Sequence, residues 1–197
     1  MTRAKRQLFG GAIQAFLPDT AVDASVVRHV PDNQEVFVHT SSDQSLIIEI
    51  LEQANVDDSN AIKYHFDALA EANDASNAND HITDKIEQIP NNSLTVQRVS
   101  TAYYLFGRQK ISKYNEQAKN LVSLHLCLLR LNELNTDILI SFNDPLFVNE
   151  DSSSHATIDS ASSNNRWTFT DFQNFYQSFE IVDFGLFTPQ QQDIEMN

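Results

Sequence analysis

The chain has 197 residues, the size of one domain, and 41% of them are hydrophobic, which is enough to form a single core. Its 13 Lys and Arg against 27 Asp and Glu give a formal net charge of −14, and such a surface repels phosphate backbones and anionic lipid headgroups. These numbers argue against nucleic acid or a membrane surface as partners and favour a basic protein surface, although the same charge also serves solubility alone.

Cys127 is the single cysteine, which excludes an intrachain disulfide and a cysteine-rich zinc site and fits the cytosol or the nucleus. Residues 1–7 are basic and are expected to form a flexible tail. The segment Leu8–Leu17, which Pro18 ends, predicts a strand rather than a signal peptide because glycines interrupt it. We expect Gly10 and Gly11 to mark a bulge or close backbone packing.

The next elements follow from periodicity. The segment Glu35–His39 alternates, which predicts a strand. Asp43 is a suitable N-cap for a helix over Gln44–Ala54, whose core face would carry Leu46, Ile47, Ile50 and Leu51. A second helix is expected after the caps Asp57, Asp58 and Ser59, with Ile62, His65, Phe66 and Leu69 on one side. Residues Glu71–Asp80 are small and polar, which predicts an exposed loop.

The second half of the chain is strand-like. Strands are predicted over Leu94–Phe106, Leu121–Leu131 and Ile138–Phe142, and the second of these is apolar enough to be covered on both faces. No helix separates them, which favours an antiparallel meander. Residues 149–165 are expected to form a mobile loop and residues 189–197 a flexible tail. Between them, a helix is predicted to begin near Thr170, with Phe172, Phe175, Tyr176 and Phe179 at helical spacing.

Four segments resemble the Ran guanine nucleotide release factor family in order and spacing. They are Leu8–Ile13 with Leu17-Pro18, Val22–Ser25 with Arg28 and Val30–Phe37, Asp43–Glu52 with Tyr64-His65-Phe66, and Leu129–Leu131 with Thr136–Asn143. The run Pro31–Glu35 between the other N-terminal motifs is highly specific. Residues 149–165 and both tails carry no clear family pattern.

The resemblance implies an α/β (α+β) fold, a single domain over residues 1–197 with a mainly antiparallel β-sheet flanked by helices on both faces, as in the PsbP-type proteins of photosynthesis. It implies binding to the small GTPase Ran and release of its guanine nucleotide in nucleocytoplasmic transport, with residence in the nucleus and the cytoplasm. It also implies a binding event rather than an enzyme reaction, so we expect no catalytic residue, no cofactor and no metal.

Glu49 and Glu52 are the first candidates for the Ran contact. On the expected helix they are i, i+3 neighbours opposite the core stripe, where an isolated carboxylate pair is usually only a solvated face. The resemblance favours a contact, because it implies acidic contact residues at these two positions. Ile48 lies off the core stripe, so it either edges the core or forms the apolar centre of the contact.

Asp32 and Glu35 are the second candidates. The run Pro31–Glu35 is foremost a turn that enters a strand, but a loop this polar also presents hydrogen-bonding groups to a partner. His65 and His125 lie in apolar segments and are expected to be hydrogen-bonded packing residues, and Cys127 is expected to be an inert buried thiol.

An enzyme is the weakest interpretation, because no G-x-S-x-G, H-E-x-x-H or phosphate-loop motif is present. The alternative function is a binding module of the same fold with a different protein partner. The sequence leaves open whether a further Ran-binding protein joins a ternary complex, and we expect the chain itself to be a monomer.

Overall fold

The computed structural model describes residues 2–112, 119–147 and 165–187, and within them two antiparallel sheets and two α-helices. The large sheet has the order β3 (Ala21–Asp23), β4 (Gln34–His39), β5 (Ser45–Glu52), β9 (Thr136–Phe147), β8 (Lys119–Leu131), β7 (Thr101–Ser112) and β6 (His81–Gln88). The small sheet has the order β1 (Arg3–Leu8), β2 (Ile13–Pro18) and β10 (Glu180–Ile181).

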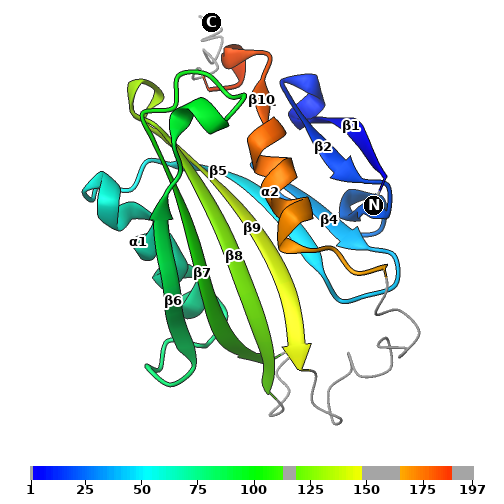
Figure 1. Cartoon of the computed structure of the whole chain (residues 1–197), viewed down its shortest axis with the longest axis vertical. Coiled ribbons are helices and arrows are strands. Elements are labelled where there is room, and N and C mark those ends of the chain that lie inside the picture. The colour runs from blue at the N-terminus through cyan, green and yellow to red at the C-terminus, as the bar shows by residue number, and fades with distance from the viewer. Residues whose placement is uncertain (1, 113–118, 148–164, 188–197) are drawn as a thin grey trace, which may run out of the picture.

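Each face of the large sheet is covered by different elements, as Figure 1 shows. Helix α1 (Asp58–Ala72) packs on one face, where Ile62 and Phe66 join buried side chains of β7, β8 and β9. Helix α2 (Phe169–Ser178) and the small sheet cover the other face, which holds the larger core cluster. The predicted arrangement, an antiparallel sheet with helices on both faces, is confirmed.

Strand β8 explains why both faces need covering. Leu124, Leu126 and Leu128 belong to the cluster under α1, whereas Cys127 and Leu129 belong to the cluster under α2. Side chains alternate between the two faces of a strand, so a nearly continuous apolar run buries both of its sides.

Two of the three predicted helices, the one after Asp57–Ser59 and the one near Thr170, are confirmed as α1 and α2. In α1, the buried residues Ile62, His65 and Phe66 share one face. The helix approaches β7 closely at Gly107, where an added Cβ would lie 2.6 Å from Cζ of Phe66. Helix α2 begins one residue earlier than expected, because Thr168 and Asp171 form a capping box.

The expected helix over Gln44–Ala54 is wrong, because the chain forms strand β5 there. Strand β5 pairs with β9 over its whole length and with β4 over Ser45–Glu49. Its sequence contains three isoleucines in an eight-residue run, and β-branched side chains pack well on a pleated sheet. An apolar run of this length satisfies helical spacing and strand alternation equally, so non-local pairing decided the outcome.

The N-terminal expectations also need correction. Residues Arg3–Gln7 are not a flexible tail but part of β1, which pairs with β2 as a hairpin. Nη2 of Arg3 lies 2.9 Å from Oδ1 of Asp171 and ties β1 to α2. Gly10 and Gly11 form the hairpin turn rather than a bulge, with φ angles of 65° and 96° that favour glycine.

The strand predicted over Leu94–Phe106 begins only at Thr101, while Leu94 and Val96 add buried side chains to the core from a loop. The strand predicted over Leu121–Leu131 is confirmed, and that over Ile138–Phe142 is confirmed as part of the longer β9. Two expected segments lie outside the described residues: the loop over residues 149–165, except Asn165, and the tail over residues 189–197.

Candidate functional site

Glu35 lies at the start of β4, on the sheet face that also carries α2 and the small sheet. Its carboxylate accepts a hydrogen bond of 2.5 Å from the backbone N–H of Phe9, in the turn of the β1–β2 hairpin. Burial raises the pKa of Glu35, the Phe9 bond opposes that effect, and the nearby charge of Asp23 raises the pKa further. Two carboxylates therefore share one small region at this end of the sheet.

Asp32 is exposed on the loop that leads into β4. The following residue, Asn33, accepts a hydrogen bond from the N–H of Ile50 at 2.9 Å, and its side chain donates to the Ile50 carbonyl at 3.2 Å. These bonds hold the loop beside the last residues of β5, which include the exposed Glu52. The structure thus brings Asp32 and Glu52 to the same end of the sheet.

A surface hollow with a volume of about 370 Å³ lies beside these residues. We call it the acidic hollow, and it is lined by Phe9, Gly10, Asp23, Ser25, Val30, Pro31, Asp32, Gln34, Glu35 and Leu186. Its lining, as far as the chain is described, contains three carboxylates and no Lys or Arg. The loop that carries Asp32 also exposes Val26 and Val27, each 79% accessible. Apolar side chains beside a charged rim are typical of protein interfaces.

Glu49, Ile48 and Glu52 do not lie on one face of a helix, as the sequence predicts. Because β5 is a strand, Glu49 points to the α1 face while Ile48 and Glu52 point to the opposite face. Ile48 is fully buried in the core, so of its two possible positions the structure selects the core. The side chain of Glu49 is half-buried and accepts a 2.7 Å hydrogen bond from Nε2 of Gln34.

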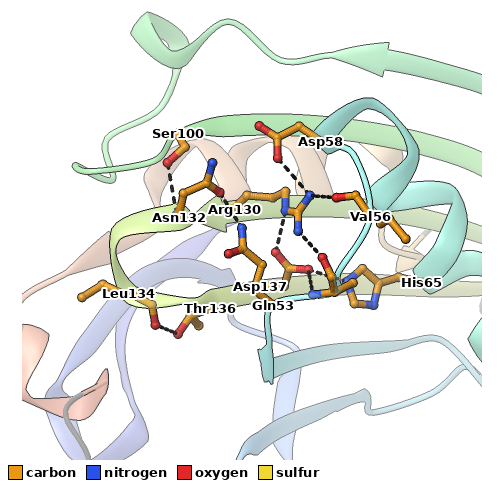
Figure 2. A network of polar contacts seen from close by, with 11 residues as sticks. Gln53, Val56, Asp58, His65, Ser100, Arg130, Asn132, Leu134, Thr136 and Asp137 are labelled. Atoms are coloured by element: carbon orange, nitrogen blue, oxygen red, sulfur yellow. Dashed lines mark hydrogen bonds and ion pairs between the residues drawn. The ribbon is translucent and has the colours of Figure 1, made fainter.

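The fourth motif of the sequence resemblance builds a buried polar network, shown in Figure 2. Arg130 is 2% exposed, and its Nε donates to Oδ1 of Asp137 at 3.0 Å. Its other nitrogens donate to Asp58 and to the carbonyls of Ala54 and Val56. Nε2 of His65 lies 2.8 Å from Oδ2 of Asp137. The network therefore fixes the segment between β5 and α1, which is a structural role.

The remaining side chains that the sequence singled out are packing residues, as predicted. Nδ1 of His125 lies 2.7 Å from the hydroxyl of Tyr104 within a group of aromatic rings. Cys127 is fully buried, and burial raises the pKa of its thiol, which makes the thiol inert.

Sequence reasoning missed Asp23 and the exposed Val26 and Val27 as parts of the candidate surface. The sequence did contain a signal for exposed valines. Val26 and Val27 are followed by Arg28 and His29, so they do not belong to an alternating strand pattern that would predict their burial. Their proximity to Glu35 depends on the pairing of β3 with β4, which sequence periodicity does not specify.

Comparison with known proteins identifies relatives over nearly the whole chain. The family model described as "Ran-interacting Mog1 protein" matches residues 6–145. A Danio rerio protein named Ran guanine nucleotide release factor is 46% identical over 183 residues, which cover 92% of this chain and 98% of that protein. The Homo sapiens protein of that name is 39% identical, with 93% of this chain and 96% of that protein covered. A Saccharomyces cerevisiae protein named nuclear import protein MOG1 is 27% identical, with 95% and 86% covered.

Solved structures agree with the fold. The structure of the Saccharomyces cerevisiae Ran-binding protein Mog1p matches 95% of this chain and 100% of its own, with a TM-score of 0.67 and 24% identity. A mutant of the protein Mog1 matches the same shares of the two chains with a TM-score of 0.69 and 23% identity. Among the described residues, no helix is long and apolar enough to cross a membrane, and no cluster of three or more potential ligand side chains is placed to hold a metal ion.

Proposed function

Because the chain belongs to the Ran-interacting Mog1 family, we propose that it binds the small GTPase Ran and promotes release of guanine nucleotide from it. The observation that carries this proposal is the 46% identity to a Ran guanine nucleotide release factor across 92% of this chain and 98% of that relative. A relative named nuclear import protein supports a role in nuclear import, with the nucleus and the cytoplasm as the expected compartments.

The proposed activity is a binding event rather than a catalysed reaction. A GTPase holds its nucleotide through phosphate and magnesium contacts from mobile loops. A partner that binds best when those loops are displaced must weaken nucleotide binding by the same coupling free energy, because linkage is reciprocal. The chain therefore acts as a regulator of the GTPase and is itself unchanged.

We propose the acidic hollow and the adjoining end of β5 as the Ran contact. Asp32 is exposed and free to meet a basic side chain, and Glu35 and Asp23 add negative charge beside it. Val26 and Val27 supply an apolar surface next to that charge. Glu52 extends the same end of the sheet, and Glu49, on the other face of β5, is kept as a further candidate for the Ran contact.

The test is a nucleotide-release assay with purified Ran loaded with fluorescent GDP or GTP, in which complex formation and nucleotide loss are followed together. Asp32→Lys replaces an attraction by a repulsion and should weaken Ran binding by about 2–5 kcal/mol, roughly 30-fold to several thousand-fold. Its melting temperature should stay unchanged, because the side chain is exposed.

Glu71→Lys is the matched control, because it makes the same charge change at an exposed position on α1, on the other face of the sheet. Glu52→Lys tests whether the contact reaches the end of β5. Normal release by a folded Asp32→Lys variant, or equal loss in Glu71→Lys, would place the contact elsewhere. A wild-type chain that neither binds Ran nor releases its nucleotide would favour a binding module with another protein partner.

A further inference from the structure

A row of stacked aromatic rings crosses three strands of the large sheet on the face that carries α2. Phe142 on β9, His125 on β8 and Phe106 on β7 are partners in the strand register. The ring centroids of Phe142 and His125 are 5.6 Å apart, and those of His125 and Phe106 are 4.8 Å apart. The interplanar angles are 21° and 28°, so the rings are stacked across the strands.

Helix α2 covers one end of this row and leaves a hollow at the other. The ring centroid of Phe172 on α2 lies 5.9 Å from that of Phe142 and 6.2 Å from that of His125, so α2 packs over β9 and β8. A helix with its side chains is about 10 Å wide and strands are about 4.8 Å apart, so one helix covers only about two strands. Figure 1 shows β6 and β7 to the left of α2. There the sheet and the helix border a hollow of about 790 Å³.

We call this hollow the aromatic groove. Its lining combines rings with side-chain amides and includes Tyr104, Phe106, Phe169, Gln88, Gln173 and Gln177. Phe169, the first residue of α2, is 40% exposed. Gln173 and Gln177 are four residues apart on α2 and therefore lie on one face of the helix. The volume of the aromatic groove lies within the range of roughly 300–1,000 Å³ that is usual for ligand sites.

The aromatic groove is electrically balanced, although the chain is strongly acidic. Of the described residues that line it, Lys85 is the only Lys or Arg and Glu87 is the only Asp or Glu. Nζ of Lys85 lies 2.7 Å from Oε1 of Glu87, so the two charges compensate each other. Burial lowers the pKa of His125 and outweighs the opposing charge of Asp144, which keeps this ring neutral at pH 7. The lining therefore favours an uncharged ligand over a phosphate or a cation.

The arrangement of the rings favours a flat ligand. An aromatic cage for a compact cation needs ring faces that surround one point. Here the rings contact one another: the ring centroid of His125 lies 4.8 Å from that of Phe106 and 5.5 Å from that of Phe169. The ring centroid of Phe169 also lies 5.2 Å from that of Tyr104. Rings at such distances pack directly against each other and leave no room for a cation between them. They form one wall, on which a planar ring stacks.

We propose that the aromatic groove binds a small, uncharged, planar heteroaromatic molecule that carries a cyclic amide. The ring of this molecule stacks on the wall that contains Phe106 and Phe169. Its amide edge, an N–H beside a C=O, meets the side chains of Gln173 and Gln177. A glutamine side chain carries both a donor and an acceptor, so it pairs with such an edge through complementary hydrogen bonds. Stacking thus supplies affinity and the amides supply specificity.

This site goes beyond the proposed function. The aromatic groove lies at the β6 edge of the large sheet, whereas the acidic hollow lies at β4, and β5, β9 and β8 separate β4 from β7. The experiments below use neither Ran nor nucleotide. Their failure would therefore leave the proposed Ran binding untouched, and a failure of Ran binding would leave this site untouched.

The experiment is an NMR titration of the full chain, labelled at isoleucine methyl groups and phenylalanine rings, with 2-quinolone as the probe. The signals of Ile89, Phe106 and Phe169, which line the aromatic groove, should shift and saturate. Those of Ile62 and Phe66, which are buried under α1, should not. The absence of a saturable shift, or equal shifts under α1, would overturn the proposal.

Two analogues of the probe separate the ring from the amide. Quinoline keeps the fused aromatic ring but lacks the N–H and the C=O, whereas 2-piperidone keeps the cyclic amide but lacks the aromatic ring. Each should bind about tenfold more weakly than 2-quinolone, because one loses the hydrogen bonds and the other loses the stacking. If either analogue binds as tightly as 2-quinolone, the proposed recognition is wrong.

A variant of the wall locates the stacked ring. Phe169→Leu removes a partly exposed ring and should weaken 2-quinolone binding about three- to tenfold while the chain still folds. Phe16→Leu is the matched control, because Phe16 is 43% exposed on β2 and does not line the aromatic groove. It should bind 2-quinolone as wild type does. Equal binding by the two folded variants would contradict stacking on Phe169.

A second variant locates the amide edge. The double variant Gln173→Met, Gln177→Met removes both amides at nearly constant side-chain length. It should bind 2-quinolone about as weakly as wild type binds quinoline, and its own affinity for quinoline should stay unchanged. A folded double variant that still prefers 2-quinolone to quinoline about tenfold would overturn the assignment of the amide edge to α2.

Discussion

At the scale of single residues, Arg130 has the largest structural consequence. It is 2% exposed and donates to two carboxylates and two backbone carbonyls. Removing one partner of a buried ion pair leaves the other charge uncompensated. Asp137 is itself fully buried, so water does not take the place of the Arg130 guanidinium beside its carboxylate when Arg130 is removed.

We therefore expect Arg130→Met to lower the free energy of unfolding by about 3–5 kcal/mol. Arg108→Met is the matched control, because Arg108 pairs with Asp84 at the surface and such surface pairs contribute only about 0–1 kcal/mol. Both are measured by urea unfolding. Equal losses in the two variants would mean that the buried network adds nothing beyond an ordinary surface pair.

Asp171 leads to a prediction about the stability of the fold at low pH. Burial would raise its pKa, but hydrogen bonds from Thr168 and the charge of Arg3 outweigh burial and lower it. A depressed folded pKa contributes stability above the unfolded value of about 3.9, and that contribution is lost as the pH falls through the folded value. Asp171→Asn should therefore be less stable than wild type at pH 7, and the difference should shrink below about pH 4. Thermal unfolding across this range checks it, and a difference independent of pH contradicts it.

At the scale of elements, β5 carries the main correction to the sequence interpretation. Its pairing with β4 and β9 sends Leu46 and Ile48 into the core and Glu49 to the other face. The whole arrangement of the candidate sites depends on this alternation. A helix over the same residues would have placed Glu49 and Glu52 together, and no acidic pair of that kind exists at β5.

Ile48→Ala tests the strand directly. The side chain is fully buried, so its truncation should cost about 2–5 kcal/mol through lost burial and a residual cavity. For a chain of this size each kcal/mol lowers the melting temperature by about 2–4 °C. Glu52→Ala, four residues further along the same strand, should stay within about 0.5 kcal/mol. An unchanged melting temperature for Ile48→Ala would contradict the buried position of Ile48 and place its side chain at the surface.

At the scale of the whole molecule, the net charge of −14 acts on encounter rather than on the fold. Three carboxylates line the acidic hollow, so the local and the overall charge have the same sign there. If the partner surface is basic, long-range attraction should speed association.

The association rate with Ran should therefore fall as salt rises, because charges are screened beyond about 10 Å at 0.1 M ionic strength. Stopped-flow measurements from low to high salt check this, and Asp32→Lys should flatten the dependence. A rate that does not change with salt would leave the acidic surface with a role in solubility only.

The sequence by itself determined those local elements whose residue pattern fits only one type of secondary structure. The apolar run of β8 and the aromatic spacing of α2 each indicate their structure without a partner. Motif order over most of the chain was also enough to indicate the family. Periodicity depends on neighbouring residues and motif order depends on position along the chain, so both can be read from the sequence without knowledge of tertiary contacts.

Only the tertiary structure decided which side chains meet. The segment of β5 satisfies two periodicities, residues 3–7 become a strand only beside β2, and the acidic hollow joins Phe9, Asp23 and Glu35 from three separate segments. The hollow of about 230 Å³ between α1 and the sheet likewise exists because α1 covers only part of that sheet face. Periodicity indicates which side chains are buried. Strand pairing and packing determine which residues each side chain contacts and on which face of the sheet it lies, because those contacts join residues far apart in the chain.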